Sequence, residues 1–68
     1  GIIDLCFETQ DGWVLVDFKT DRRGLGDAAV RQRHGPQVES YAAAMQKAGL
    51  RVIKKTVYLL AVGREVEL

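Results

Sequence analysis

Two aspartates and a lysine in the first nineteen residues have the types and spacing for metal-assisted phosphoryl chemistry. Asp17 and Lys19 are separated by one residue, and Asp4 precedes both. Hydrolysis of a phosphodiester at neutral pH needs a group that neutralises developing negative charge and a group that activates water, and a divalent metal ion does both. Magnesium keeps several waters, so one or two carboxylates can hold it. Asp4 and Asp17 are therefore candidate ligands for Mg²⁺, with Mn²⁺ as the expected substitute.

A β-hairpin is the element that must bring these groups together. Residues 2–8 and 13–19 are rich in β-branched, aromatic and aliphatic side chains, and Asp11-Gly12 between them is a strong two-residue turn signal. The cross-strand pairs that this turn implies are Gln10–Trp13, Cys6–Asp17 and Asp4–Lys19. The Cα atoms of Asp4 and Asp17 would then be roughly 7–8 Å apart. Lys19, roughly 6–7 Å along the strand from Asp17, could orient or deprotonate the attacking water.

The two-residue period of the strands sorts this hairpin into two faces. One face is entirely apolar and the other carries the charges; the apolar set is Ile3, Leu5, Phe7, Val14, Val16 and Phe18, and the opposite set is Asp4, Cys6, Glu8, Leu15, Asp17 and Lys19. Any even loop length preserves this sorting. We expect the apolar face to pack on the core and the charged groups to project from the open face. A structure in which the side chains of Asp4, Asp17 and Lys19 point to opposite sides of the sheet, or are shielded from solvent by packing, would end the nuclease interpretation. The backbone carbonyl of Phe18 is a further candidate ligand.

The rest of the chain predicts one main helix and one or two more strands. Residues 20–35 contain three glycines and five arginine or histidine residues, which favours a loop with at most one helical turn, in which His34 is solvated. Pro36 at a first helical position and Gly49 as the terminating residue predict a helix over about residues 36–48. Its apolar stripe is Val38, Tyr41, Ala42 and Met45. A strand within residues 52–62 and a short last strand over 65–68 follow. The fold class is α/β, with a small mixed β-sheet.

Length and composition limit the chain to one small domain. It has 68 residues, of which 47% are hydrophobic and 28% charged, as in a folding globular segment. Its apolar runs are too short to cross a membrane, and its single cysteine, Cys6, cannot form an internal disulfide, which favours a reducing compartment such as the cytoplasm. Because the sequence opens on Gly1 with no initiating Met, we expect a piece of a longer polypeptide.

The net charge of +1 does not by itself indicate a binding partner, but the order of acidic and basic residues along the chain does. Acidic residues dominate the first seventeen positions, and a group of basic residues follows them. An acidic centre beside a basic segment suits a metal site next to a nucleic-acid phosphate chain. The predicted phosphate contacts are Arg22, Arg23, Arg31 and Arg33, for which a merely solvated loop is the alternative.

Four short motifs in order resemble a known family. They are Gly1-Ile2-Ile3-Asp4, the hairpin, Val16-Asp17-Phe18-Lys19-Thr20, and Gln37-x-x-x-Tyr41. Together they cover nearly the whole chain and are similar to the RecB-type branch of the PD-(D/E)XK nucleases, within it most of all to the nuclease domain of AddA-like helicase–nuclease subunits. The resemblance makes residues 1–68 part of a nuclease domain of restriction-endonuclease-like fold. The family's pattern also has an acidic or histidine residue on a helix upstream of Gly1-Ile2-Ile3-Asp4.

The resemblance also implies roles for individual residues. Asp4, Asp17 and the Phe18 carbonyl would be metal ligands, Lys19 the catalytic lysine, and Gln37 and Tyr41 a helix-borne pair that supports the site and contacts DNA. It implies a magnesium-dependent exonuclease module that acts on single-stranded DNA in break repair and recombination, beside a helicase domain and a partner subunit. For Tyr41, packing in the apolar stripe is an equal alternative.

Two rival interpretations remain open from the sequence. The first is a catalytically silent relative that keeps the fold as a nucleic-acid-binding or structural module. The second is a generic small α/β interaction domain in which the Asp-x-Lys triplet is a solvated surface ion pair. Metal binding that depends on Asp4 and Asp17 would distinguish the nuclease from both.

Overall fold

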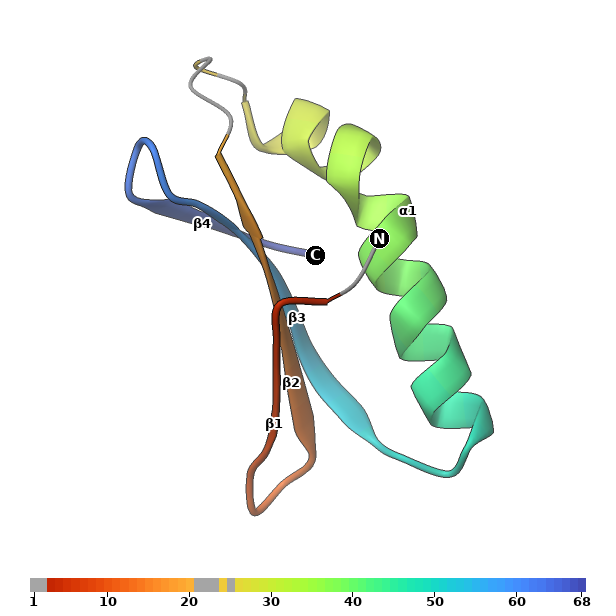
Figure 1. The fold of residues 1–68 in the computed structure, drawn as a ribbon. Coiled ribbons are helices and arrows are strands. Elements are labelled where there is room, and N and C mark those ends of the chain that lie inside the picture. The colour runs from red at the N-terminus through yellow and green to blue at the C-terminus, as the bar shows by residue number, and fades with distance from the viewer. Residues whose placement is uncertain (1–2, 21–23, 25) are drawn as a thin grey trace.

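The described part of the chain folds as one four-stranded sheet with a single long helix on one face. The computed structural model describes residues 3–20, 24 and 26–68. Its elements are β1 (Leu5–Glu8), β2 (Trp13–Lys19), α1 (Asp27–Lys47), β3 (Val52–Leu59) and β4 (Arg64–Glu67). The strands lie in the order β1-β2-β3-β4, and α1 connects the two parallel central strands (Figure 1). The outer pairs are antiparallel. The predicted α/β class with a small mixed sheet is confirmed.

The hairpin turns one residue earlier than the sequence predicted. Thr9 and Gly12 exchange backbone hydrogen bonds of 2.7 and 3.3 Å, so Gln10 and Asp11 form the loop. The observed register pairs Cys6 with Leu15 and Leu5 with Val16, and the predicted pairs Cys6–Asp17 and Asp4–Lys19 are wrong. The Thr9 side chain favours the earlier turn, because its hydroxyl accepts from the Asp11 N–H and donates to the Gly12 carbonyl. The register shifts by two residues, so the sorting of the paired strand residues into faces is unchanged. The prediction for Ile3 is wrong, because it lies in the core with Leu15 and not on the face of Leu5 and Phe7.

Gly12 is required at the point where the hairpin meets β3. Its φ is +152°, and a Cβ atom placed there would lie 2.7 Å from Cγ2 of Ile53 and 2.8 Å from the carbonyl oxygen of Arg51. The same carbonyl accepts a 2.7 Å hydrogen bond from the Trp13 N–H. A side chain at Gly12 would therefore push β3 away from β2 at the start of their pairing.

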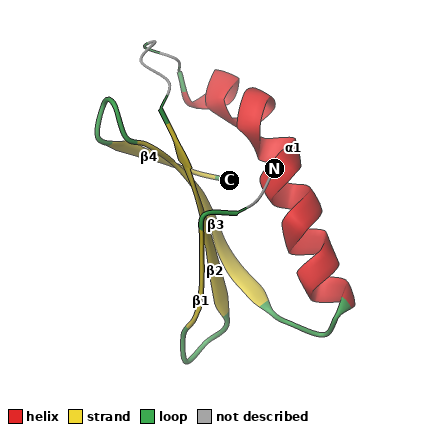
Figure 2. Cartoon of the chain, in the orientation of Figure 1, coloured by secondary structure: helices red, strands yellow, loops and turns green. Residues whose placement is uncertain are grey.

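Helix α1 begins nine residues before the predicted start. It runs over Asp27–Lys47, so most of the predicted loop is helical, and Gly35 and Pro36 lie inside the helix. Figure 2 shows one continuous helix with a bend, which is the expected effect of a proline that removes one helical hydrogen bond. A stripe at four-residue spacing compensates for this cost, because Val30, His34, Val38 and Ala42 are all buried. The prediction that His34 is solvated in a loop is wrong for the same reason.

The helix covers the face of the sheet that carries Asp17, and the prediction that it packs on the all-apolar face is wrong. Leu15 is fully buried beneath it, whereas Leu5 and Phe7 on the opposite face are 42% and 43% exposed. The reason is non-local: the buried residues Val57, Leu59 and Val66 of β3 and β4 lie in register with Asp17 and Lys19 and complete the core on that side. Ile3 also joins this core, since the chain bends at Asp4 before β1 begins.

Among the described residues, two ion pairs join α1 to the sheet at separate points. Asp27 in the first turn lies 3.2 Å from Arg64 of β4, and Glu39 lies 2.7 Å from Lys55 of β3. These pairs are partly exposed and add little energy by themselves. In the part of the chain that the structure describes, no helix is long and apolar enough to span a membrane.

Candidate active site

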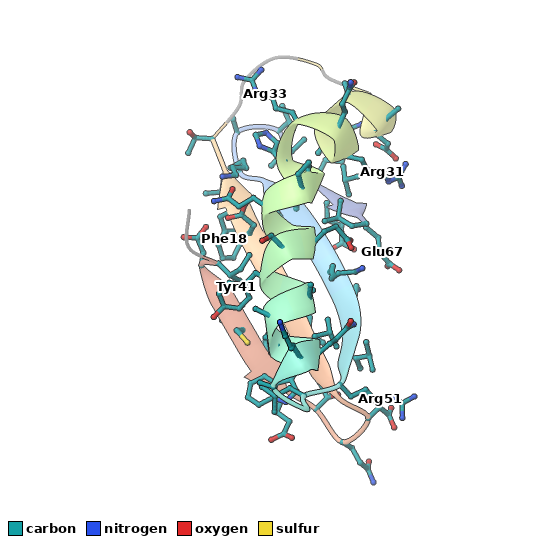
Figure 3. The ribbon with its side chains drawn as sticks, turned by 90° about the vertical axis from the view of Figure 1, so that its right-hand side faces the viewer. Phe18, Arg31, Arg33, Tyr41, Arg51 and Glu67 are labelled. Carbon is teal, nitrogen blue, oxygen red and sulfur yellow. The ribbon has the colours of Figure 1, made fainter. Side chains whose placement is uncertain are left out.

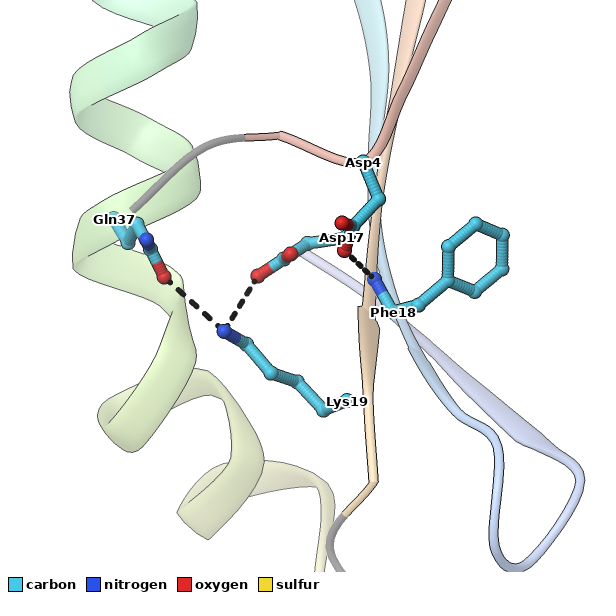
Figure 4. Close-up of polar contacts among 5 residues, drawn as sticks. All are labelled: Asp4, Asp17, Phe18, Lys19 and Gln37. Atoms are coloured by element: carbon cyan, nitrogen blue, oxygen red, sulfur yellow. Dashed lines mark hydrogen bonds and ion pairs between the residues drawn. The ribbon is translucent and has the colours of Figure 1, made fainter.

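Three of the predicted site residues meet between β2 and α1. The Lys19 Nζ atom lies 3.2 Å from Asp17 Oδ2 and donates a 3.3 Å hydrogen bond to Oε1 of Gln37 (Figure 4). Asp17 and Lys19 point to the same face of β2, two residues apart, and Gln37 reaches them from the helix. Gln37 precedes the fully buried Val38, so core packing fixes its backbone. The sequence grouped these residues only by resemblance, and the fold brings their polar atoms into contact.

The side chain of Asp17 is shielded, contrary to the open arrangement predicted from the sequence. It is 2% exposed, against 26% for the Lys19 side chain. Its Oδ2 atom has no hydrogen-bond partner among the residues described, because the Lys19 ammonium is near it without the alignment of a hydrogen bond. The cause is the helix packing on this face of the sheet. A buried carboxylate oxygen that lacks a directed partner is costly in a structural ion pair, and it retains a lone pair for a cation.

Asp4 is attached to the same strand through a backbone contact. Its Oδ2 atom accepts a 2.9 Å hydrogen bond from the Phe18 N–H. Every second cross-strand pair of the hairpin is hydrogen-bonded, counting from Thr9–Gly12. If β1 extended back to Ile3, the Ile3 carbonyl would therefore accept the hydrogen bond from the Phe18 N–H. The Asp4 carboxylate takes that place because β1 begins only at Leu5. This contact holds Asp4 next to the peptide that joins Asp17 to Phe18, and it leaves Oδ1 of Asp4 outside that hydrogen bond.

The Phe18 carbonyl faces the same edge of β2 as Asp4. The Lys19 carbonyl accepts a 2.8 Å hydrogen bond from Leu60 and so points toward the β3 side. Carbonyls alternate along a strand, which turns the Phe18 carbonyl toward the β1 side. The position of the Phe18 N–H, bound to Asp4, agrees with this direction. The backbone thus places a third oxygen at the edge where the Asp4 side chain lies.

These groups fit a hard divalent cation. The donors are two carboxylates and one carbonyl, all oxygens, and one carboxylate oxygen is buried without a directed partner. Magnesium accepts such a partial set, because waters complete its octahedron. The described residues contain no cluster of three histidine, cysteine, aspartate or glutamate side chains, so the set does not suit zinc or another metal that needs a full side-chain cage.

Tyr41 stands at the margin of the core. It follows Gln37 by one helical turn and is 40% exposed, so of the two sequence interpretations the structure disfavours packing in the apolar stripe. Figure 3 shows Tyr41 on the side of α1 nearest the hairpin, whereas Figure 4 shows the Phe18 ring on the other face of β2, pointing away from α1. Phe18 and Tyr58 pair edge to face across β2 and β3, with ring centroids 6.0 Å apart. Tyr41 makes none of the hydrogen bonds that hold Lys19.

The predicted phosphate contacts do not share one environment. Arg31 donates from Nε to the carbonyl of Glu67 at 3.0 Å, and thereby caps the outer edge of β4. The prediction that Arg31 and Arg33 lie in a loop is wrong, because both residues belong to α1. Arg33 is exposed (Figure 3). Arg22 and Arg23 lie outside the described residues.

His34 was missed as a core residue, although a signal for it exists. It stands four residues after Val30 and four before Val38, and all three are buried on one stripe of α1. That spacing indicates a helix face, but Gly35 and Pro36 next to it suggested a break. Cys6 is partly buried against the core on the same side as Leu15.

Comparisons with known proteins identify the family and several relatives of this chain. The model of the PD-(D/E)XK nuclease superfamily matches residues 1–66. A protein of Lachnoclostridium phytofermentans that is named as an ATP-dependent helicase/nuclease subunit is 39% identical over 70 residues, and its namesake in Thermoanaerobacter sp. strain X514 is 39% identical over 69 residues. These matches cover 100% and 98% of this chain.

A third relative of the same name, from Desulforudis audaxviator, is 46% identical over 56 residues, or 81% of the chain. The chain spans only 5–6% of the length of these relatives. The family match covers the strand that carries Asp17 and Lys19 and also the helix that carries Gln37. The chain belongs to the PD-(D/E)XK nuclease superfamily.

Proposed function

We propose that this chain supplies the metal site and the catalytic lysine of a nuclease that hydrolyses phosphodiester bonds in DNA. The observation that carries the proposal is the meeting of Asp17, Lys19 and Gln37 between β2 and α1, with Asp4 bound to the adjoining Phe18 N–H. Family membership favours this interpretation over a coincidental Asp-x-Lys triplet in an interaction domain.

Each residue has a role that its position supports. Asp4, Asp17 and the Phe18 carbonyl would hold Mg²⁺ or Mn²⁺, which when bound neutralises charge on the scissile phosphate and activates water. The Lys19 ammonium orients the attacking water and offsets negative charge on the phosphate, and it can accept a proton from that water only after it has itself lost one. Gln37 positions the Lys19 ammonium through the 3.3 Å hydrogen bond. Tyr41, exposed one turn further along α1, is available to contact the DNA strand.

The wider setting is also a proposal. The relatives are named as helicase/nuclease subunits, and the chain covers a small part of each. We infer an exonuclease module that acts on single-stranded DNA delivered by a helicase domain of the same polypeptide, with a partner subunit, in cytoplasmic break repair and recombination. Arg33, together with Arg22 and Arg23, would contact the phosphate chain.

A chimera tests the activity in a complete enzyme. The 70 matched residues of the Lachnoclostridium relative are replaced by this chain, and Mn²⁺-dependent cleavage of single-stranded DNA is measured for the chimera and for the isolated chain. We expect cleavage by the chimera and loss of at least roughly 100-fold with Lys19→Met. Lys47→Met, at the exposed end of α1, is the matched control and should retain full activity.

A catalytically silent DNA-binding relative is the second candidate. The observation that favours it is that Asp17 is shielded and no third acidic or histidine side chain joins it in the described part of the chain. The same chimera separates the two candidates. A chimera that folds and binds DNA but does not cleave it, while the parent relative does cleave, would establish the silent function and overturn the nuclease proposal.

A further inference from the structure

The Lys19 ammonium and a divalent cation cannot both contact Oδ2 of Asp17 in this conformation. Oδ2 of Asp17 is buried, and the Lys19 Nζ atom lies 3.2 Å from it. Figure 4 shows the ammonium on the side of the Asp17 carboxylate that faces α1, between that carboxylate and Gln37. Like charges at such a distance repel by several times the thermal energy when they are partly buried. A cation that binds Oδ2 must therefore displace the ammonium.

Lys19 has a second acceptor within reach. Oε1 of Gln37 already accepts a hydrogen bond from the same nitrogen at 3.3 Å. The glutamine backbone is held by the neighbouring buried residue Val38, whereas the Lys19 side chain is 26% exposed and has a long flexible stem. When the Lys19 ammonium leaves Asp17, it can therefore stay in the site through its hydrogen bond to the neutral Oε1 atom of Gln37.

We propose that Lys19 and Gln37 form a gate over Asp17, in which a divalent cation reaches Oδ2 only as the Lys19 ammonium shifts fully onto Gln37. Gln37 is then a positioning residue that sets the metal affinity of the site through Lys19. The inference rests on the proposed metal site and adds a competition between the metal ion and the lysine for one carboxylate oxygen.

The gate predicts effects of opposite sign for its two members. Lys19→Met removes the competing cation, so the dissociation constant for Mn²⁺ should fall roughly tenfold. Gln37→Met keeps the bulk of the side chain but removes the second acceptor, so the ammonium stays on Asp17 and the dissociation constant should rise roughly threefold. In the double variant the Gln37 substitution should have no further effect, because Gln37 acts only through Lys19.

The experiment is a Mn²⁺ titration of the 68-residue chain, with free Mn²⁺ measured by electron paramagnetic resonance and thermal unfolding recorded for each variant. Gln46→Met, an exposed glutamine on the same helix, is the matched control and should leave the affinity unchanged. Lys19→Gln, which also removes the positive charge, should move the affinity in the same direction as Lys19→Met. It serves as the second variant if Lys19→Met does not fold.

The outcomes separate the gate from the metal site on which it rests. If Asp17→Asn leaves Mn²⁺ binding unchanged, or if the chain does not bind Mn²⁺, the metal site itself fails and the gate with it. If binding depends on Asp17 but Gln37→Met does not weaken it, or weakens it equally in the Lys19→Met background, the gate is overturned and the metal site stands. Weaker binding by Lys19→Met would also overturn the gate.

Discussion

The two faces of the sheet differ in a way that hydrophobicity alone does not explain. On the hairpin, the face with Leu5 and Phe7 is the more apolar one, yet these side chains are 42% and 43% exposed. The opposite face carries Asp17 and Lys19 and is covered by α1. No described element covers the first face. The helix therefore packs on the face where β3 and β4 complete an apolar core, even though this packing buries the Asp17 carboxylate.

The largest expected effect is on the helix-covered face. Leu15→Ala should lower the free energy of unfolding by about 2–5 kcal/mol, because it removes a fully buried side chain and leaves a cavity. Thermal or urea unfolding followed by circular dichroism measures it. Leu5→Ala is the matched control, the same change on the other face, and should cost much less. Equal costs for the two leucines would contradict the difference between the faces.

The next effect concerns the hairpin that fixes which residues share a face. Gly12→Ala should destabilise the chain by about 2 kcal/mol, since the added methyl meets Ile53 and the Arg51 carbonyl and φ is positive. Gly24→Ala, where a Cβ atom meets nothing within 4 Å, is the control. Both are measured by chemical unfolding. Equal stability of Gly12→Ala and the unsubstituted chain would mean that the hairpin does not approach β3 in this way.

A smaller effect of opposite sign is expected for the buried carboxylate. Asp17→Asn should raise the unfolding free energy by about 1 kcal/mol when a chelator is present, because it removes a shielded charge while Lys19 remains free to turn toward solvent. Asp11→Asn in the exposed turn is the control and should be neutral. A loss of stability in Asp17→Asn would show that the ion pair with Lys19 holds the fold and that its function is structural.

The smallest effect is expected on the uncovered face. Phe7→Thr should change the unfolding free energy by less than about 1 kcal/mol, because Phe7 remains about half exposed and threonine keeps a favourable strand propensity. Differential scanning calorimetry of the two proteins measures the change. A cost as large as that of Leu15→Ala would show that this face is buried in solution, and the comparison of the two faces would fail.

Much of the local structure could be predicted from the sequence, and the errors share one cause. The hairpin, its sorting into faces, the last strand and the mixed sheet follow from alternation and turn residues close in the chain. The start of α1 was predicted nine residues late, because Pro36 is a local signal for a helix start while burial of Val30 and His34 is a tertiary effect. Tertiary packing outweighed the local signal.

For the candidate site, the sequence likewise predicted the residues but not the contacts between them. Residue type and strand spacing singled out Asp17 and Lys19, because the strand period is a local property, whereas Gln37 was grouped with them only by the resemblance to the family. Their contacts could not be predicted, since the distance from Lys19 Nζ to Gln37 Oε1 depends on which face α1 covers. The hydrogen bond from the Phe18 N–H to the Asp4 carboxylate likewise depends on where β1 begins.

The sequence by itself determined the types of side chain that could bind a cation, their order on strand and helix, and the family to which they belong. Only the tertiary structure decided that Asp17 is shielded and that Lys19 stands between it and Gln37. The physical reason is that burial depends on the sum of apolar contacts from strands far apart in the chain. A short stretch of sequence therefore does not determine which of its side chains will be buried.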